Sequence, residues 1–258
     1  MSSLTYALSD TVVLAKRSLL RIPRAPDLLL SFTVQPIMFV LLFVYVFGGA
    51  IDTPGYEDYT DFLMPGIVAQ TMSFGGFVTA LGLAEDLKKG LIDRFRSLPM
   101  SRAAVLAGRT LADVATNVIS LTIMIGVGLA VGFRFHSTPL EVVAGIGLML
   151  LFGYAFSWIF AYCGLTASSG ESAQAIGFIV IFPITFISSA FVPPDSMPSW
   201  LQPIAENNPF TTVVDAMRAL WVDAPAGNDI WGAVLWSLGL VAVFAPLSVA
   251  RYRRAVSA

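Results

Sequence analysis

One short stretch of the chain, residues 88–102, holds an unusually dense group of charged side chains. Its sequence is KKGLIDRFRSLPMSR, and six of its fifteen residues are charged. In the whole chain of 258 residues, only 12% are charged and 56% are hydrophobic. Long apolar segments flank the stretch on both sides, so its charges call for an explanation.

A helix over residues 85–98 accounts for the pattern in and around this stretch. Pro99 ends the helix because it lacks a backbone N–H and clashes with the preceding turn. An apolar ridge with a charged rim is suited to docking into a groove of another protein. The alternative is a loop whose basic residues only fix membrane topology, but such a loop requires neither mixed charges nor an apolar stripe. The apolar stripe consists of Leu87, Leu91, Phe95 and Leu98, and the charged residues around it are Glu85, Asp86, Lys88, Lys89, Asp93, Arg94 and Arg96.

Few other residues of the chain are of types that carry out chemistry. Cys163 is the only cysteine and His136 the only histidine, which excludes an internal disulfide framework and leaves little material for a metal centre or a His-based catalytic triad. The chain has no G-x-x-x-x-G-K-[ST] phosphate loop and no Gly-Lys dipeptide. We therefore predict a chain that is not an enzyme, holds no metal or cofactor, and binds no nucleic acid.

The apolar segments predict an all-α integral membrane protein. A stretch of roughly 20 apolar residues crosses a bilayer core as a helix, and a soluble domain could not bury a chain this hydrophobic. No repeat or soluble domain separates the segments, so we expect one transmembrane domain over residues 1–258. The six predicted spans are 28–50, 61–84, 107–132, 139–166, 174–192 and 229–250.

The positions of Lys and Arg predict the orientation of this domain. Thirteen of the 15 basic residues fall before the first span, between the second and third, or after the sixth. Because the number of spans is even, these groups share one side, which the positive-inside rule places in the cytoplasm. Only Arg134 and Arg218 fall on the other side. We predict a multi-pass protein of the cell membrane, in contact with the lipid bilayer, with both termini cytoplasmic.

Two segments outside the spans also have helical periodicity. The spacing of apolar and basic residues over 8–24 predicts a helix that lies in the inner membrane interface. This helix is either an elbow that braces the first span or a plain interfacial anchor. Residues 193–222 are too polar and Pro-rich to span but carry two apolar stripes, and Asn208 is expected to cap a helix that has Pro209 at its first position. We predict an outer hairpin over 193–222, with an ordinary structured loop as the alternative.

Neutral polar and aromatic residues inside the spans are the candidates for a translocation path. Carboxylates at membrane depth mark proton and ion relays, and we expect none at the middle of these spans. Amide, hydroxyl and aromatic groups suit an apolar or amphipathic cargo, although for each residue singly the alternative is packing in the core or against lipid. The candidates are Gln35, Phe39, Phe43, Gln70, Ser73, Phe74, Phe77, Ser188 and Ser189, and Thr71 adds polarity at the same depth.

Two motifs resemble those of a known family. GLIDRFRSLPMSRAAVLAGRTLADV (90–114) resembles the cytoplasmic-loop motif of ABC exporter permeases of the second export type, closest to the daunorubicin/doxorubicin-resistance branch. FVPPDSMPSWLQPIAENNPFTTVVDAMRALW (191–221) is similar to a second motif of that family. The resemblance implies that the helix over 85–98 is a coupling helix seated in a cleft of an ATP-binding subunit, and that the 193–222 hairpin is re-entrant.

The resemblance implies a function and a set of partners. We expect the permease subunit of an ABC exporter that moves a hydrophobic or amphipathic drug, antibiotic or lipid. Two copies of an ATPase subunit, which bind the ATP and Mg, and a second permease copy or a similar permease would complete the transporter. A glycan-exporting ABC permease and an ion-coupled secondary transporter are the alternatives; the latter should carry buried Asp, Glu or His for its coupling ion. An intramembrane protease would need a Ser–His pair or paired Asp residues at membrane depth.

Overall fold

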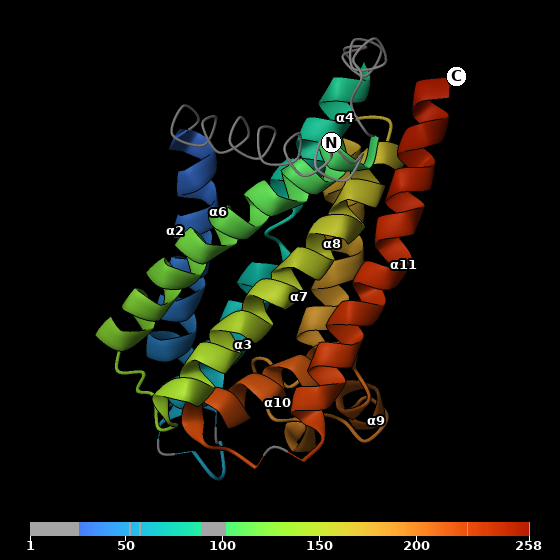
Figure 1. Cartoon of the computed structure of the whole chain (residues 1–258). Coiled ribbons are helices and arrows are strands. Elements are labelled where there is room, and N and C mark those ends of the chain that lie inside the picture. The colour runs from blue at the N-terminus through green and yellow to red at the C-terminus, as the bar shows by residue number, and fades with distance from the viewer. Residues whose placement is uncertain (1–25, 52, 57, 89–101, 226, 258) are drawn as a thin grey trace.

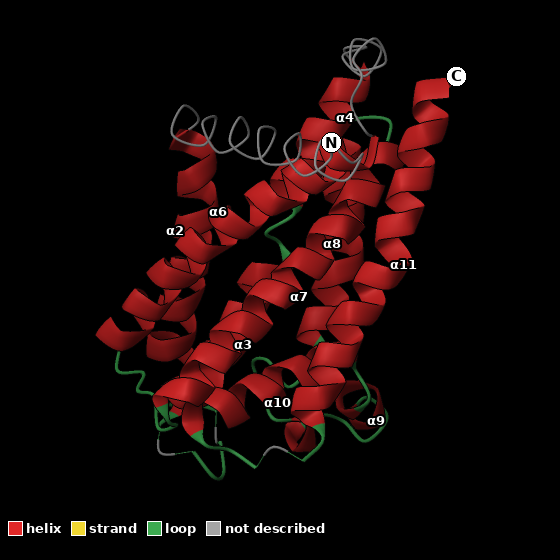
Figure 2. Cartoon of the chain, viewed as in Figure 1, coloured by secondary structure: helices red, strands yellow, loops and turns green. Residues whose placement is uncertain are grey.

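The computed structural model of the chain describes residues 26–51, 53–56, 58–88, 102–225 and 227–257. Within this part, every regular element is a helix (Figures 1 and 2). The elements are α2 (Pro26–Leu42), the π-helix η2 (Phe43–Phe47), α3 (Tyr59–Ser73), α4 (Phe77–Lys88), α6 (Arg102–Ala130), α7 (Pro139–Thr166), α8 (Gly170–Phe186), the short 3-10 helix η3 (Pro194–Ser196), α9 (Gln202–Glu206), α10 (Pro209–Val222) and α11 (Asp229–Ser257).

The helices agree with an integral membrane protein. Four of the described helical segments are long and apolar enough to cross a membrane: Tyr59–Leu87, Leu106–Ala130, Pro139–Thr166 and Asp229–Arg254. Val34–Phe47 and Gly170–Phe186 are apolar but shorter, and they lie where the first and fifth spans are predicted. The prediction of an all-α membrane protein is confirmed, while a count of six spans stays a prediction.

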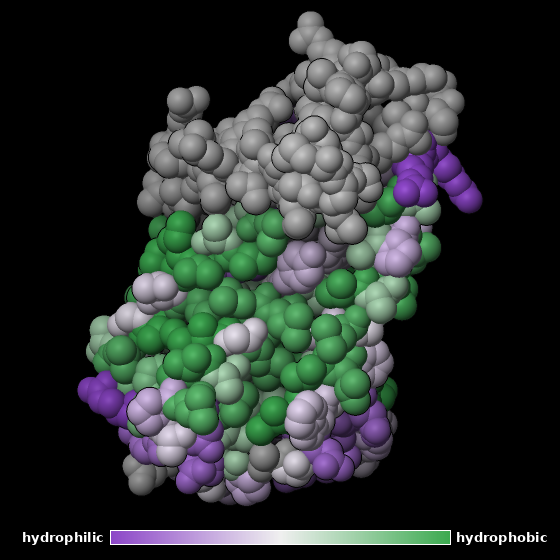
Figure 3. All heavy atoms as spheres, in the orientation of Figure 1, coloured by the Kyte–Doolittle hydropathy of each residue, from purple (hydrophilic) through white to green (hydrophobic). Residues whose placement is uncertain are grey.

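The surface of the described residues is divided into apolar and polar zones, as expected for a membrane protein. In Figure 3 hydrophobic residues form a broad band, with hydrophilic residues at the end that holds α10 and near the C-terminal end of α11. Large apolar side chains are exposed among the described residues, for example Tyr45, Ile179 and Leu235, at 72%, 72% and 68%. Apolar groups exposed in this way are stable against lipid chains and costly in water.

Helix α7 is the central element of the structure. It begins at Pro139 because Thr138 and Glu141 form a capping box, in which each side chain pairs with the backbone N–H of the other residue. The helix contacts α3, α4, α6, α8, α10 and α11. Gly164 allows α4 to approach closely, since a Cβ there would clash with the backbone of Ala80. The predicted span 139–166 coincides with this helix.

The second predicted span, 61–84, is not one uninterrupted helix. The chain turns at residues 74–76, between α3 and α4. Gly75 and Gly76 occupy the turn, and glycine is the least favoured residue of a helix interior apart from proline. Because neither has a side chain, the turn packs directly against Asn117 of α6 and Ser157 of α7. A Cβ at either glycine would collide with these neighbours.

The predicted outer hairpin contains two helices, α9 and α10. The predicted cap of α10 is confirmed, because the Asn208 side chain accepts a hydrogen bond from the Phe210 N–H at 2.9 Å and Pro209 is the first helical residue. The Asn208 amide also donates to the carbonyls of Ile184 and Ile187 at the end of α8. Figure 1 shows α10 lying across one end of the molecule, opposite the C-terminal ends of α4 and α11.

Two predicted elements lie wholly or partly outside the described residues. The elbow helix over 8–24 is one of them. Of the helix predicted over 85–98, only the part up to Lys88 is described, as the last turn of α4.

Candidate functional site

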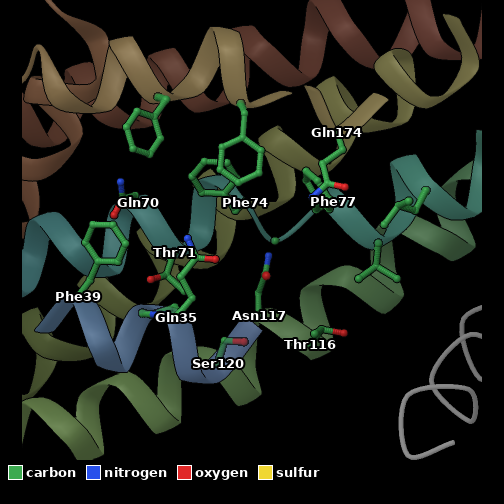
Figure 4. Close-up of a pocket in the computed structure, with 16 residues that line it drawn as sticks. Gln35, Phe39, Gln70, Thr71, Phe74, Phe77, Thr116, Asn117, Ser120 and Gln174 are labelled. Atoms are coloured by element: carbon green, nitrogen blue, oxygen red, sulfur yellow. The ribbon is translucent and has the colours of Figure 1, made fainter. Parts of the chain in front are cut away.

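A cavity of about 280 Å³ lies beside the turn that separates α3 from α4 (Figure 4). Its walls come from α2, α3, α4, α6 and α8, at positions near the middle of the apolar segments. Uncharged polar groups and aromatic rings make up most of the wall. The lining residues are Gln35, Pro36, Phe39, Gln70, Thr71, Phe74, Gly75, Phe77, Val78, Leu81, Thr116, Asn117, Ser120, Gln174, Phe178 and Phe182.

Helical periodicity determines which side chains face the cavity. On α8, Gln174, Phe178 and Phe182 recur every four residues, so they share one face of the helix. On α6, Thr116, Asn117 and Ser120 occupy positions i, i+1 and i+4 of one stripe. The turn at residues 74–76 adds Phe74 and Gly75 to the wall from between these faces.

The structure brings together five of the nine residues predicted to line a translocation path. Gln35, Phe39, Gln70, Phe74 and Phe77 all line the cavity, and Thr71 lies among them. The other four lie elsewhere, and they are Phe43, Ser73, Ser188 and Ser189.

Local bonding accounts for the positions of these four residues. The Phe43 ring, in η2, stacks on Phe191 with 4.8 Å between the ring centroids. Ser73 donates to the carbonyl of Gln70 within its own helix at 2.7 Å. Ser188 and Ser189 follow the end of α8, where Ser189 contacts α10.

The sequence analysis overlooked the polar side chains that α6 and α8 contribute: Thr116, Asn117, Ser120 and Gln174. Their spacing on one stripe of an apolar helix is the signal that could have identified those of α6. Asn117 is the most deeply buried of them, at 1% exposure. Its Nδ2 has no hydrogen-bond partner among the described residues. The amide is held between the backbones of Gly75 and Gly153, where a Cβ on Gly153 would lie 2.6 Å from Nδ2.

Helix α4 connects the cavity to the charged stretch of the sequence. Its first turns supply Phe77, Val78 and Leu81 to the cavity wall. Near its other end Asp86 forms an ion pair with Arg109 of α6, and both side chains are largely buried. Glu85 is exposed on the same turn, and Lys88 ends the helix. The remaining predicted coupling residues, Lys89, Leu91, Asp93, Arg94, Phe95, Arg96, Leu98 and Pro99, lie outside the described residues.

At the opposite end of the molecule, Arg218 joins three elements. It is 2% exposed, and its guanidinium donates to the carbonyl of Phe62 in α3 at 3.0 and 3.1 Å. It also donates to the carbonyl and hydroxyl of Ser189 at 2.6 and 2.9 Å, and to Asp215 at 2.7 Å. Arginine supplies five donors in a fixed plane, which suits this number of acceptors.

Burial shifts the pKa of Arg218 and that of a neighbouring tyrosine in opposite directions. Burial lowers the pKa of the Arg218 guanidinium, and the Asp215 carboxylate opposes that shift. Burial raises the pKa of the nearby Tyr56 above its usual value, and the Arg218 cation opposes that shift. The sequence analysis counted Arg218 only as a basic residue on the outer side, because nothing in the local pattern indicates its burial.

His136 is also tied into this end of the structure. Its Nε2 lies 2.9 Å from Oδ2 of the buried Asp61, and its backbone N–H donates to the carbonyl of Trp221 at 3.0 Å. His136 thus links the loop before α7 to α3 and α10. Among the described residues, no group of three or more His, Cys, Asp or Glu side chains could hold a metal ion.

Comparison with known proteins identifies the family. The model of the family described as "ABC-2 type transporter" matches residues 9–221. The chain belongs to this family. The resemblance drawn from the two sequence motifs is therefore confirmed, as is the expected function class, the permease subunit of an ATP-binding-cassette exporter.

Individual permeases resemble the chain over most of its length. The chain is 37% identical to the daunorubicin resistance ABC transporter permease protein DrrB1 of Streptomyces coeruleorubidus, over 96% of this chain and 87% of the relative. It is 26% identical to the probable doxorubicin resistance permease DrrC of Mycobacterium tuberculosis, over 96% of this chain and 89% of the relative. The probable multidrug permease YbhR of Escherichia coli is 24% identical over 77% of this chain and 54% of the relative.

Proposed function

We propose that the chain exports an apolar or amphipathic drug-like cargo, and that the cavity beside residues 74–76 receives this cargo. The observation that carries the proposal is the double role of α4, whose first turns form a cavity wall and whose last turn leads into the charged stretch. Displacement of that stretch would therefore move one wall of the cavity. The names of the relatives, which refer to daunorubicin, doxorubicin and multiple drugs, support a drug as cargo.

The coupling segment in this proposal is residues 85–98. Arg94 and Arg96 would hold it by charge in a cleft of the partner ATPase, while Leu91 and Phe95 would fill that cleft. Two copies of this partner would bind and hydrolyse ATP with Mg. The ion pair between Asp86 and Arg109 supports this role, because it joins α4 to α6 near the start of the segment. Movement transmitted from the ATPase would thus reach both helices.

The membrane arrangement completes the proposal. Six spans, with the segments containing Val34–Phe47 and Gly170–Phe186 as the first and fifth, would place both termini and the coupling segment in the cytoplasm. The α9–α10 hairpin would then lie at the outer face of the cell membrane. A second permease copy or a similar permease would provide the other half of the pathway.

Co-purification with ATPase activity tests this function. The full chain, tagged and extracted from its native membrane in mild detergent, should bring down an ATPase whose activity rises when daunorubicin is added. The double variant R94E/R96E should insert normally but recover at most about a tenth of that activity, because like charges across a docking surface repel. The matched control R253E/R254E makes the same charge change on α11 and should retain the ATPase. Full ATPase recovery with R94E/R96E would contradict the docking role.

Vesicle transport provides the second half of the test. Vesicles that contain the purified complex should accumulate daunorubicin only when ATP is present. Accumulation that instead follows an imposed proton or sodium gradient without ATP would show a secondary transporter.

A further inference from the structure

A second cavity, of about 780 Å³, lies between α8 and α11 near the end of the molecule that carries α9 and α10. Both helices pack against α7, whose Phe152 and Phe156 form the floor of the cavity (Figure 1). These two floor residues are buried, at 3% and 9% exposure. The edges are exposed instead, with Val180, Ile184 and Trp236 at 51%, 42% and 48%. The cavity is therefore a groove whose open side faces the surroundings of the helices.

Almost the whole wall of this groove is apolar. Of its 18 lining residues, all of which are described, only Asn207 and Asn208 are polar, and none is charged. The side-chain NH2 groups of these two asparagines already donate to carbonyls of the chain, those of Pro203, Ile184 and Ile187. A polar ligand would leave its hydrogen bonds to water unreplaced here, whereas a hydrocarbon chain has none to lose. The wall therefore favours hydrocarbon.

The groove also has the length of an acyl chain within one leaflet. On α11 the lining residues Trp236, Leu240 and Phe244 recur every four positions, so the groove follows this helix over roughly 12 Å. Half of the hydrocarbon core of a bilayer is about 15 Å thick. A lipid chain that runs beside α11 would thus fill the groove, and its methylenes would gain dispersion contacts with the aromatic floor that an empty groove lacks.

The charges around α9 discriminate among the headgroups of such a lipid. Trp200 and Trp231, at 70% and 73% exposure, mark this end of the molecule as the membrane interface. Over residues 187–236 the chain carries five acidic residues and one basic residue, Arg218, which is only 2% exposed. Glu206 is the exposed carboxylate of α9, one residue before the groove wall. An anionic headgroup would be repelled here and an ammonium group attracted.

We infer that the groove between α8 and α11 is a binding site for one acyl chain of a resident phospholipid, whose ammonium-bearing headgroup lies beside α9. This lipid is not cargo: it braces the α9–α10 hairpin against α8 and α11. The inference goes beyond the proposed export function and rests only on the proposed membrane arrangement, which places this end of the molecule in the outer leaflet.

Photo-crosslinking in the assembled transporter tests the site. The full chain in complex with its ATPase would be placed, without ATP, in phosphatidylcholine nanodiscs that contain a small fraction of probe lipid. The probes are phosphatidylethanolamine and phosphatidylglycerol, each with a diazirine midway along one acyl chain, and mass spectrometry would locate the label. In the wild type the phosphatidylethanolamine probe should label Phe152 or Phe156, at least about fivefold more than the phosphatidylglycerol probe does. Lipid outside the groove does not reach these buried residues.

Two substitutions on α11 separate occupancy of the groove from general contact with lipid. L240W places a larger side chain in the groove and should lower the labelling of the floor at least about fivefold. L235W makes the same change at a residue that is 68% exposed and does not line the groove, so its labelling should match the wild type. Both complexes should retain their ATPase, which would exclude misfolding as the cause.

A charge reversal tests the headgroup preference. E206K should abolish or reverse the preference for phosphatidylethanolamine over phosphatidylglycerol, a change that misfolding cannot produce. E171K makes the same charge change in the first turn of α8, at the opposite end of that helix, and should keep the preference of the wild type.

Several results would overturn the inference. Equal labelling of the floor in L240W and L235W would show that no lipid chain occupies the groove, and equal labelling by the two probes would refute the headgroup preference. Loss of the label when daunorubicin is added would assign the groove to cargo, and a wild-type floor without label would leave it to the second permease copy. None of these measurements requires transport, so a failure of the proposed export function would not affect them.

Discussion

The guanidinium carbon of Arg218 lies 3.7 Å from the centre of the Phe62 ring, and the same guanidinium donates two hydrogen bonds to the Phe62 carbonyl. One residue of α10 thus holds both the side chain and the backbone of α3. Since Arg218 also bonds Ser189 beyond the end of α8, it fastens together the end of the molecule that carries the outer hairpin. An arginine is suited to this role because its charge is permanent and its donors are coplanar.

Removal of the Arg218 side chain should loosen this end. R218L leaves the carbonyls of Phe62 and Ser189 without these donors, so we expect a loss of at least about 2 kcal/mol in stability. Thermal unfolding in detergent, followed by size-exclusion chromatography, would measure it. The control D215N should cost less than about 1 kcal/mol, because the Asp215 side chain is 35% exposed and Arg218 retains its other acceptors. Equal losses in both variants would show that the carboxylate rather than the carbonyls is the main partner.

A methyl group at Gly75 should disturb the cavity. In G75A the added Cβ collides with the Asn117 amide, so α6 and the turn must separate. We expect the ATP-driven uptake of daunorubicin into vesicles to fall at least about fivefold, while membrane insertion is retained. In the control G126A the new Cβ meets no atom within 4 Å, so uptake should be unchanged. Normal uptake by G75A would mean that the close approach at this turn is not needed for transport.

The ion pair between Asp86 and Arg109 should couple α4 to α6. The charge reversals D86R and R109D should each lower cargo-stimulated ATP hydrolysis in the complex, because each places like charges together. The double variant D86R/R109D restores opposite charges and should recover part of the activity, with a coupling energy of about 1 kcal/mol. Strictly additive losses in the double variant would refute the proposed link.

Asn208 should contribute to stability through both the oxygen and the NH2 group of its side-chain amide. N208D keeps the acceptor for the Phe210 N–H but loses the donor to Ile184 and Ile187, whereas N208A loses both. We expect N208A to be the less stable variant, by about 1 kcal/mol, which is the usual value of a helix N-cap. The comparison requires only the two unfolding midpoints in the same detergent. A midpoint for N208D at or below that of N208A would assign the stabilisation to the bonds with α8 alone.

The sequence by itself determined the parts of the structure that depend on local chemistry. The length of the apolar segments predicted the apolar helices, because every backbone polar group in a membrane must be hydrogen-bonded within its own helix. Capping chemistry predicted the start of α10, where Asn208 and Pro209 supply what a first helical turn lacks. Residue types alone also indicated that an uncharged, partly polar surface lies within the spans.

Only the tertiary structure decided which of those residues meet. Helix α8 ends at Phe186 rather than at the predicted 192, where Asn208 from α10 pairs with the carbonyls of Ile184 and Ile187. Gln174 and Asn117 come to one cavity because α6 and α8 flank the turn at residues 74–76. Arg218, which the sequence presents as an ordinary outer charge, is buried because its acceptors come from segments 29 and 156 residues away. Such long-range partners leave no trace in local periodicity, which reports only which face of a helix is apolar.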